Sequence, residues 1–261
     1  MTQPVPRPAT EPTVVAHRGA SGTAPENTIS AMRAAKALGA TWVEFDVTLL
    51  GDGTPVVHHD ATLDRTTNRT GRLADITRSD LAIIDAGCRF GEAFTGEPLP
   101  TFAELLDVVL DAGLSANIEL KPHGASEATA KAVLERLAPG SSLADRVTIS
   151  SFDHDALAVV RAASDTLPVS VLYKTPAPDY LDTLERLRAE ALHIAHAAAD
   201  AALVAAAREA GFPVRCFTVN DPQDAARLAQ ISVTGIFTDY PERFISDPAW
   251  SPLAACTQST V

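Results

Sequence analysis

Three acidic side chains lie in two short apolar stretches of the sequence. Glu44 and Asp46 are two positions apart within residues 42–47, and Glu119 lies near the end of residues 116–120. Side chains two positions apart on a β-strand point to the same face. Carboxylates that converge without an equal number of cations should not all remain ionised. A divalent metal resolves this conflict, and an all-oxygen ligand set favours Mg²⁺ or Ca²⁺, with Mn²⁺ as a further candidate.

Two histidines and two cations accompany these carboxylates. His17 and His59 are candidates for proton transfer, because imidazole titrates near neutral pH without help from its surroundings. Arg18 can grip phosphate oxygens through two N–H groups, and Lys121 adds a point charge. His58 directly precedes His59. We interpret His58 as a structural histidine rather than a catalytic one.

Short apolar, β-rich segments alternate along the chain with longer segments of helical periodicity. The predicted strands are residues 14–17, 42–47, 116–120, 146–150, 168–173, 192–196, 214–219 and 234–238, and the predicted helices are residues 28–38, 102–112, 128–137, 155–163, 180–189, 201–210 and 222–229. Such alternation predicts an α/β fold with a parallel sheet and crossover helices. Eight repeats in 261 residues favour a single closed (β/α)8 barrel over an open doubly wound sheet, which stays the alternative.

The candidate residues fall where such a barrel carries its chemistry, at the C-terminal ends of the strands. Charged side chains are costly inside a barrel unless they are paired or bound to a metal. So many of them at one level therefore predict a polar pocket. Surface salt bridges at the rim of the barrel are the plainer alternative.

One segment interrupts the alternation. Residues 48–100 are polar and rich in turn-forming residues, which predicts a small insertion after the second strand. Within it we expect an extra short strand at 54–58 and a short helix at 79–85. A loop of this length in a barrel is usually functional, and His59 lies in it.

The barrel domain is expected to span residues 13–246. It follows a flexible segment at 1–12 and precedes a peripheral tail at 247–261. The first twelve residues are polar and proline-rich and lack the apolar region of a signal peptide, and no stretch reaches the length of a membrane span. These features predict a cytoplasmic protein without stable membrane insertion.

The overall charge limits the range of partners. The net charge is −12, which repels the backbone of a nucleic acid, so nucleic acid is not an expected partner. A small anionic substrate is compatible with this charge if a local cation reverses the field at the site. The three cysteines show neither metal-ligand spacing nor a disulfide framework.

The candidate residues belong to sequence blocks that resemble the glycerophosphodiester phosphodiesterases. The blocks are HRGA (17–20), PENT (25–28), EFD (44–46), VVHHDATLDRTTNRTG (56–71), LPTFAELL (99–106), NIELK (117–121), SSF (150–152), TVND (218–221) and TDYP (238–241). The resemblance covers roughly residues 13–245. It is specific, because the blocks follow one another at fitting distances.

This resemblance implies a TIM-barrel hydrolase whose small-molecule substrate, a glycerophosphodiester, is split into glycerol 3-phosphate and an alcohol. The roles it implies are metal binding by Glu44, Asp46 and Glu119, acid–base catalysis by His17 and His59, and phosphate binding by Arg18 and Lys121. Two positions depart from the family pattern. His58 stands where an apolar residue usually precedes the second catalytic histidine, and Phe217 stands where a tryptophan often precedes TVN.

Three other functions stay open at the level of sequence. A lysophospholipase D would use the same site on a substrate that carries an acyl chain. A metal-dependent aldolase or enolase-type barrel also uses carboxylates and Mg²⁺, but it does not need paired histidines flanked by arginine and lysine. A non-catalytic module that binds a phosphate ligand would tolerate the loss of His17.

Overall fold

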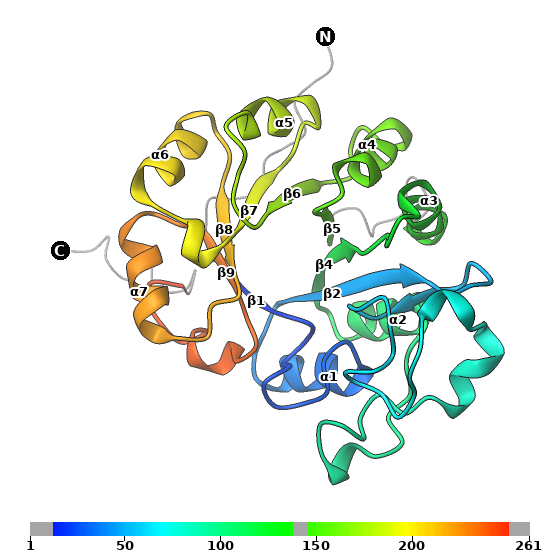
Figure 1. Cartoon of the computed structure of the whole chain (residues 1–261). Coiled ribbons are helices and arrows are strands. Elements are labelled where there is room, and N and C mark those ends of the chain that lie inside the picture. The colour runs from blue at the N-terminus through cyan, green and yellow to red at the C-terminus, as the bar shows by residue number, and fades with distance from the viewer. Residues whose placement is uncertain (1–12, 138–145, 251–261) are drawn as a thin grey trace.

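The computed structural model describes residues 13–137 and 146–250, and its strands close into a barrel (Figure 1). The barrel strands are β1 (Thr13–Ala16), β2 (Trp42–Leu49), β4 (Ser115–Leu120), β5 (Val147–Ser151), β6 (Val169–Tyr173), β7 (Ala191–Ala195), β8 (Val214–Phe217) and β9 (Gly235–Thr238). Neighbouring strands of the ring are parallel, and β1 closes it by pairing with both β2 and β9. The predicted closed (β/α)8 barrel is confirmed, and the open sheet is excluded.

Helices connect the strands and surround the ring (Figure 1). They are α1 (Ile29–Ala37), α2 (Phe102–Asp111), α3 (Ser126–Leu137), α4 (His154–Ala163), α5 (Tyr180–Arg186), α6 (Ala201–Glu209) and α7 (Pro222–Gln230). Every predicted helix is present. Helix α5 ends earlier than expected, since the backbone of Arg188 adopts the left-handed conformation, with φ 47°, and cannot continue the helix.

Strand β2 shows how the barrel separates its core from its site. Val43, Phe45 and Val47 are fully buried in the main hydrophobic core, which also contains the buried faces of the surrounding helices. Glu44 and Asp46 alternate with these residues and therefore point to the opposite face, inside the ring. The apolar core thus fixes the strand that carries two of the candidate carboxylates.

The segment after β2 forms a small structure outside the ring. Strand β3 (Pro55–Val57), the predicted extra strand, pairs antiparallel with β2, and the predicted short helix is the 3₁₀ helix η2 (Arg78–Ile83). Two further 3₁₀ helices, η1 (Leu73–Asp75) and η3 (Glu92–Phe94), complete it. Its own hydrophobic cluster consists of Leu50, Val56, Leu63, Leu73, Ile84, Ala86 and Leu99. This second core gives the segment a fixed shape, so His59 follows β3 at a defined position.

The predicted flexible segment at 1–12 lies outside the described residues, as does the larger part of the predicted tail. The described part of that tail ends at Trp250, which is buried in the main core with 1% of its surface exposed. Cys256 lies outside the described residues as well. In residues 13–137 and 146–250, every helix is too short or too polar to cross a membrane.

Gly19 connects the end of β1 to α1 in a tight turn with φ +80°, and a Cβ atom there would lie 2.6 Å from the carbonyl carbon of Ala31. We predict that Gly19→Ala destabilises the protein more than Gly53→Ala. Gly53 has a similar φ of +83° but open space around it. Both variants should lose about 1–2 kcal/mol from the left-handed backbone. Gly19→Ala should lose about 1–3 kcal/mol more, because the added methyl group meets backbone atoms.

The measurement is urea denaturation of both variants beside the parent protein. Equal destabilisation by the two substitutions would contradict the close packing of the β1–α1 turn.

Candidate active site

A cavity of about 480 Å³ opens at the C-terminal ends of the barrel strands. Six of the seven predicted site residues line it: His17, Arg18, Glu44, His59, Glu119 and Lys121. The seventh, Asp46, is buried beside them with 1% of its surface exposed. The structure therefore brings all the candidate residues together, although His59 comes from the segment outside the ring.

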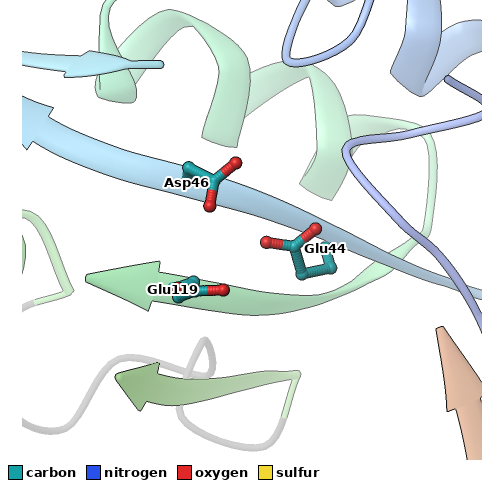
Figure 2. Close-up of side chains that lie close together, drawn as sticks. All are labelled: Glu44, Asp46 and Glu119. Atoms are coloured by element: carbon teal, nitrogen blue, oxygen red, sulfur yellow. The ribbon is translucent and has the colours of Figure 1, made fainter. Parts of the chain in front are cut away.

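Glu44, Asp46 and Glu119 converge inside the barrel, on two neighbouring strands (Figure 2). The register of β2 and β4 places Asp46 directly opposite Glu119. Each residue offers a carboxylate oxygen, and these oxygens lie within 4.8 Å of one another. All three side chains are buried. They are therefore not the exposed salt bridges that the sequence also allowed.

The three carboxylates differ in their readiness to ionise. Burial, reinforced by the charges of Asp46 and Glu119, raises the pKa of Glu44 well above its usual range. Burial and the charge of Asp46 raise the pKa of Glu119 to about 7. Burial also opposes ionisation of Asp46, but the charges of Arg18 and Lys121 outweigh it and lower the pKa of Asp46 to about 2. Without a metal, the cluster therefore retains protons that a divalent cation would displace.

Two cations face the three carboxylates. Lys121 Nζ lies in contact with Glu119 Oε1 and 3.5 Å from Asp46 Oδ1. Arg18 Nε lies 3.3 Å from Asp46 Oδ2, and the backbone N–H of Arg18 donates a 2.9 Å hydrogen bond to Glu44 Oε2. The second oxygen of Glu44, Oε1, is buried and has no hydrogen-bond partner among the described residues. A buried, unpaired oxygen in a carboxylate set suits a hard divalent cation.

Asn27 contacts Asp46 instead of capping the first helix. Its position before the first helix suggests an N-cap, but Thr28 is the cap, and the Thr28 hydroxyl accepts from the backbone N–H of Ala31. Asn27 instead donates a 2.7 Å hydrogen bond from Nδ2 to Asp46 Oδ2, and its Oδ1 accepts from the backbone N–H of Asp46. Asn27 therefore fixes the orientation of the Asp46 carboxylate.

Each of the two candidate catalytic histidines is held by a carboxylate through Nδ1. His17 Nδ1 lies 2.7 Å from Asp239 Oδ1, and His59 Nδ1 lies 2.5 Å from Asp60 Oδ1. This contact leaves Nε2 of each ring available to a molecule in the cavity. A carboxylate at Nδ1 orients the ring and stabilises its protonated form. The pair is therefore equipped for proton transfer in either direction.

His58 does not line the cavity, which agrees with its interpretation as a structural rather than a catalytic histidine. It is buried, and its Nε2 lies 2.9 Å from the carbonyl oxygen of Thr62. Its backbone N–H donates to the carbonyl of Asp46 and so ties β3 to β2. Burial lowers the pKa of His58, which keeps the ring neutral.

A family model for glycerophosphoryl diester phosphodiesterases matches residues 17–243. This chain belongs to that enzyme family. The resemblance in the sequence blocks is confirmed by a relative from Caldanaerobacter subterraneus subsp. tengcongensis, a glycerophosphodiester phosphodiesterase. It is 37% identical over 238 residues, which cover 89% of this chain and 96% of the relative.

Solved structures of the same family share the barrel. An Oleispira antarctica phosphodiesterase in complex with the product sn-glycerol-3-phosphate is 34% identical, with a TM-score of 0.85, over 90% of this chain and 96% of that chain. A putative glycerophosphoryl diester phosphodiesterase from Silicibacter pomeroyi is 29% identical, with a TM-score of 0.82, over 96% of this chain and 98% of that chain. Both likenesses extend through nearly the whole of each chain.

In this family member, Arg65 links the segment outside the ring to the connection between β1 and α1. Its Nε donates to Asp60 Oδ2 at 2.7 Å, and its Nη1 and Nη2 donate to Glu26 at 2.6 and 2.8 Å. Glu26 also accepts from Arg18 Nη1 at 2.7 Å. A chain of charged contacts thus runs from Arg18 to the carboxylate that holds His59. Arg65 is not among the candidate residues predicted from the sequence, although it lies in the 56–71 block.

Four apolar side chains form one wall of the cavity. Phe152, Leu172, Phe217 and Phe237 line it, and the rings of Phe152 and Phe217 meet edge to face at 5.6 Å between centroids. Phe217 is the residue that stands in place of the frequent family tryptophan. The cavity therefore combines charged residues from β1, β2 and β4 with an apolar wall, and the two meet where Lys121 Nζ lies 5.5 Å from the centroid of the Phe152 ring.

The pKa of Glu119 predicts how the metal-free protein responds to pH. The pKa is about 7 in the folded protein and 4.5 is its ordinary value, so the folded state retains a proton that the unfolded chain releases. The resulting contribution to stability is complete below pH 4.5 and is lost as the pH rises through 7. Glu119→Gln cannot titrate. We predict that the variant gains stability relative to the parent protein as the pH rises from 4.5 to 7.

This difference is measured by denaturation of both proteins in buffers that contain a chelator. A difference that does not change with pH would contradict the protonated state of Glu119.

Proposed function

We propose that this protein hydrolyses glycerophosphodiesters to glycerol 3-phosphate and an alcohol, with a divalent cation held by Glu44, Asp46 and Glu119. The observation that carries the proposal is the presence of this carboxylate cluster and two carboxylate-held histidines in one cavity. The names of the relatives, and the product bound to the Oleispira antarctica enzyme, support this substrate class.

The residues around the cluster are suited to bind a phosphodiester. A bound Mg²⁺ or Ca²⁺, or Mn²⁺ in their place, would neutralise charge on the phosphoryl oxygens. Arg18 and Lys121 line the cavity beside the carboxylates and present N–H donors to the same oxygens. Arg18 is held by Glu26 and Asp46, and Lys121 is held by Glu119. These donors are therefore positioned before the substrate arrives.

His17 and His59 supply the two proton transfers that hydrolysis needs. One ring removes a proton from the attacking hydroxyl, which belongs to water or to the glycerol of the substrate. The other ring protonates the departing alkoxide. If the glycerol hydroxyl attacks, the first product is a cyclic phosphate, and a water molecule then opens it to glycerol 3-phosphate in a second step. Asp239 and Asp60 stabilise whichever ring is protonated, and their contacts at Nδ1 leave Nε2 of each ring available to the substrate.

The apolar wall favours one related substrate as a second candidate. Phe152 lines the cavity while 37% of its surface stays exposed, so it could contact an acyl chain that extends from the substrate. Lysophosphatidylcholine, the substrate of a lysophospholipase D, presents such a chain. Parallel assays of lysophosphatidylcholine and glycerophosphocholine decide between the two activities.

The proposed function predicts choline release from glycerophosphocholine that depends on a divalent metal. A chelator should abolish the release, and Mg²⁺, Ca²⁺ or Mn²⁺ should restore it, since without the cation the charge on the phosphoryl oxygens is not neutralised. The assay measures choline and glycerol 3-phosphate together. Full activity in metal-free protein would contradict the role of the cluster. Choline phosphate as the product would contradict the proposed bond cleavage.

Substitution of the histidines tests their roles directly. His17→Ala and His59→Ala should each lower kcat by a factor of about a hundred to ten thousand, with folding and metal binding retained. The double variant should be little worse than the poorer single variant, because the pair acts as a unit.

His58→Ala is the matched control. It should keep kcat within about tenfold of the parent, since a residue outside proton transfer does not set the rate. If His58→Ala is inactive and His59→Ala is active, the second catalytic histidine is His58 and not His59.

A further inference from the structure

The floor of the cavity contains a histidine that the proposed chemistry does not use. His193 lies on β7 with 1% of its surface exposed, and it lines the cavity. Its ring packs against Phe237 with 4.9 Å between centroids. The hydrogen-bonding geometry of His193 indicates a specific role.

Arg215, on the neighbouring strand β8, determines which nitrogen of His193 carries the proton. Arg215 Nη1 lies 3.2 Å from His193 Nε2 and also donates to Glu190 Oε1 at 3.1 Å. A guanidinium group can donate hydrogen bonds but cannot accept them, so His193 Nε2 must be the acceptor. Burial, reinforced by the charge of Arg215, lowers the pKa of His193 well below its usual range and keeps the ring neutral. The single ring proton therefore resides on Nδ1.

That proton has no acceptor in the described parts of the chain. His193 Nδ1 is buried and lacks a hydrogen-bond partner there. Asn117, on β4, has an unpaired acceptor where His193 has an unpaired donor. Its Nδ2 donates to Ser150 Oγ at 2.9 Å, while its buried Oδ1 lacks a partner among the same residues. Buried polar atoms are rarely left without partners, so a molecule in the cavity is the natural partner of both.

We infer that His193 Nδ1–H and Asn117 Oδ1 form a hydroxyl-binding floor that recognises the glycerol moiety of the substrate. This inference rests on the proposed function and deepens it. Both residues line the same cavity as the catalytic histidines. The floor offers one neutral donor and one neutral acceptor. A phosphate group accepts only and an ammonium group donates only, whereas each hydroxyl of glycerol does both.

Two substitutions of His193 separate its nitrogen atoms. The side-chain amide of glutamine reaches the position of Nε2, so His193→Gln retains a partner for Arg215 and loses the donor in the cavity. The amide of asparagine reaches the position of Nδ1, so His193→Asn retains that donor. The ligands are sn-glycerol 3-phosphate and propyl phosphate, which has the same chain length and no hydroxyl groups. Calorimetry on the Mg²⁺-loaded full-length chain measures their affinities.

We expect the parent protein to bind sn-glycerol 3-phosphate more tightly than propyl phosphate. His193→Gln should lose about three- to tenfold in affinity for sn-glycerol 3-phosphate, which corresponds to one neutral hydrogen bond. Its affinity for propyl phosphate should stay unchanged, and His193→Asn should resemble the parent protein. Equal losses for both ligands, or no loss for either, would overturn the inference.

A second measurement, on the parent protein, tests the inference even if His193→Gln does not fold. In ¹⁵N NMR, the Nδ1–H signal that is absent from His193→Asn should shift with sn-glycerol 3-phosphate and not with propyl phosphate. The same shift with both ligands would overturn the inference. Glycerophosphocholine hydrolysis is assayed separately. Selective binding of sn-glycerol 3-phosphate without hydrolysis of glycerophosphocholine would contradict the proposed function but would still support the hydroxyl-binding floor.

Discussion

Three carboxylates that converge inside a closed ring of strands are the constraint on which the rest of the site depends. Glu44 and Asp46 share one face of β2, and β4 places Glu119 beside them. Burial and mutual repulsion prevent all three from ionising unless positive charge is brought to them. Arg18 and Lys121 supply part of that charge, and the same two side chains line the cavity where a phosphate would bind.

The residues around this cluster keep it in a geometry that the carboxylates alone would not adopt. Asn27 holds Asp46 through two hydrogen bonds, and Arg65 connects the segment outside the ring to the side of the cavity that carries Arg18. The separate hydrophobic cluster of that segment explains how a histidine after β3 can occupy a fixed place. The barrel therefore supplies the carboxylate cluster, while the inserted segment supplies one of the two histidines and its carboxylate.

The sequence predicts the barrel and the carboxylates well, because both depend on short-range periodicity. A strand period of two places Glu44 and Asp46 on one face, and alternating segments require parallel neighbours. The pairing of His17 with Asp239 joins residues 222 positions apart and appears only once the ring closes. The contact of Asn27 with Asp46 could not be predicted from the sequence, since asparagine before a helix is equally suited to capping and to a distant contact. The role of His193 depends on the strand register that brings Arg215 beside it.

The central claim is that a divalent cation replaces protons at the buried carboxylates. Calorimetric titration of metal-free protein with Mn²⁺ near pH 6, in two buffers of different ionisation enthalpy, measures metal binding and proton release in the same experiment. One Mn²⁺ per chain should bind with release of protons, because Glu44 and Glu119 are protonated beforehand. Asp46→Asn should weaken the binding strongly. Binding without proton release, or binding that Asp46→Asn leaves unchanged, would contradict the account.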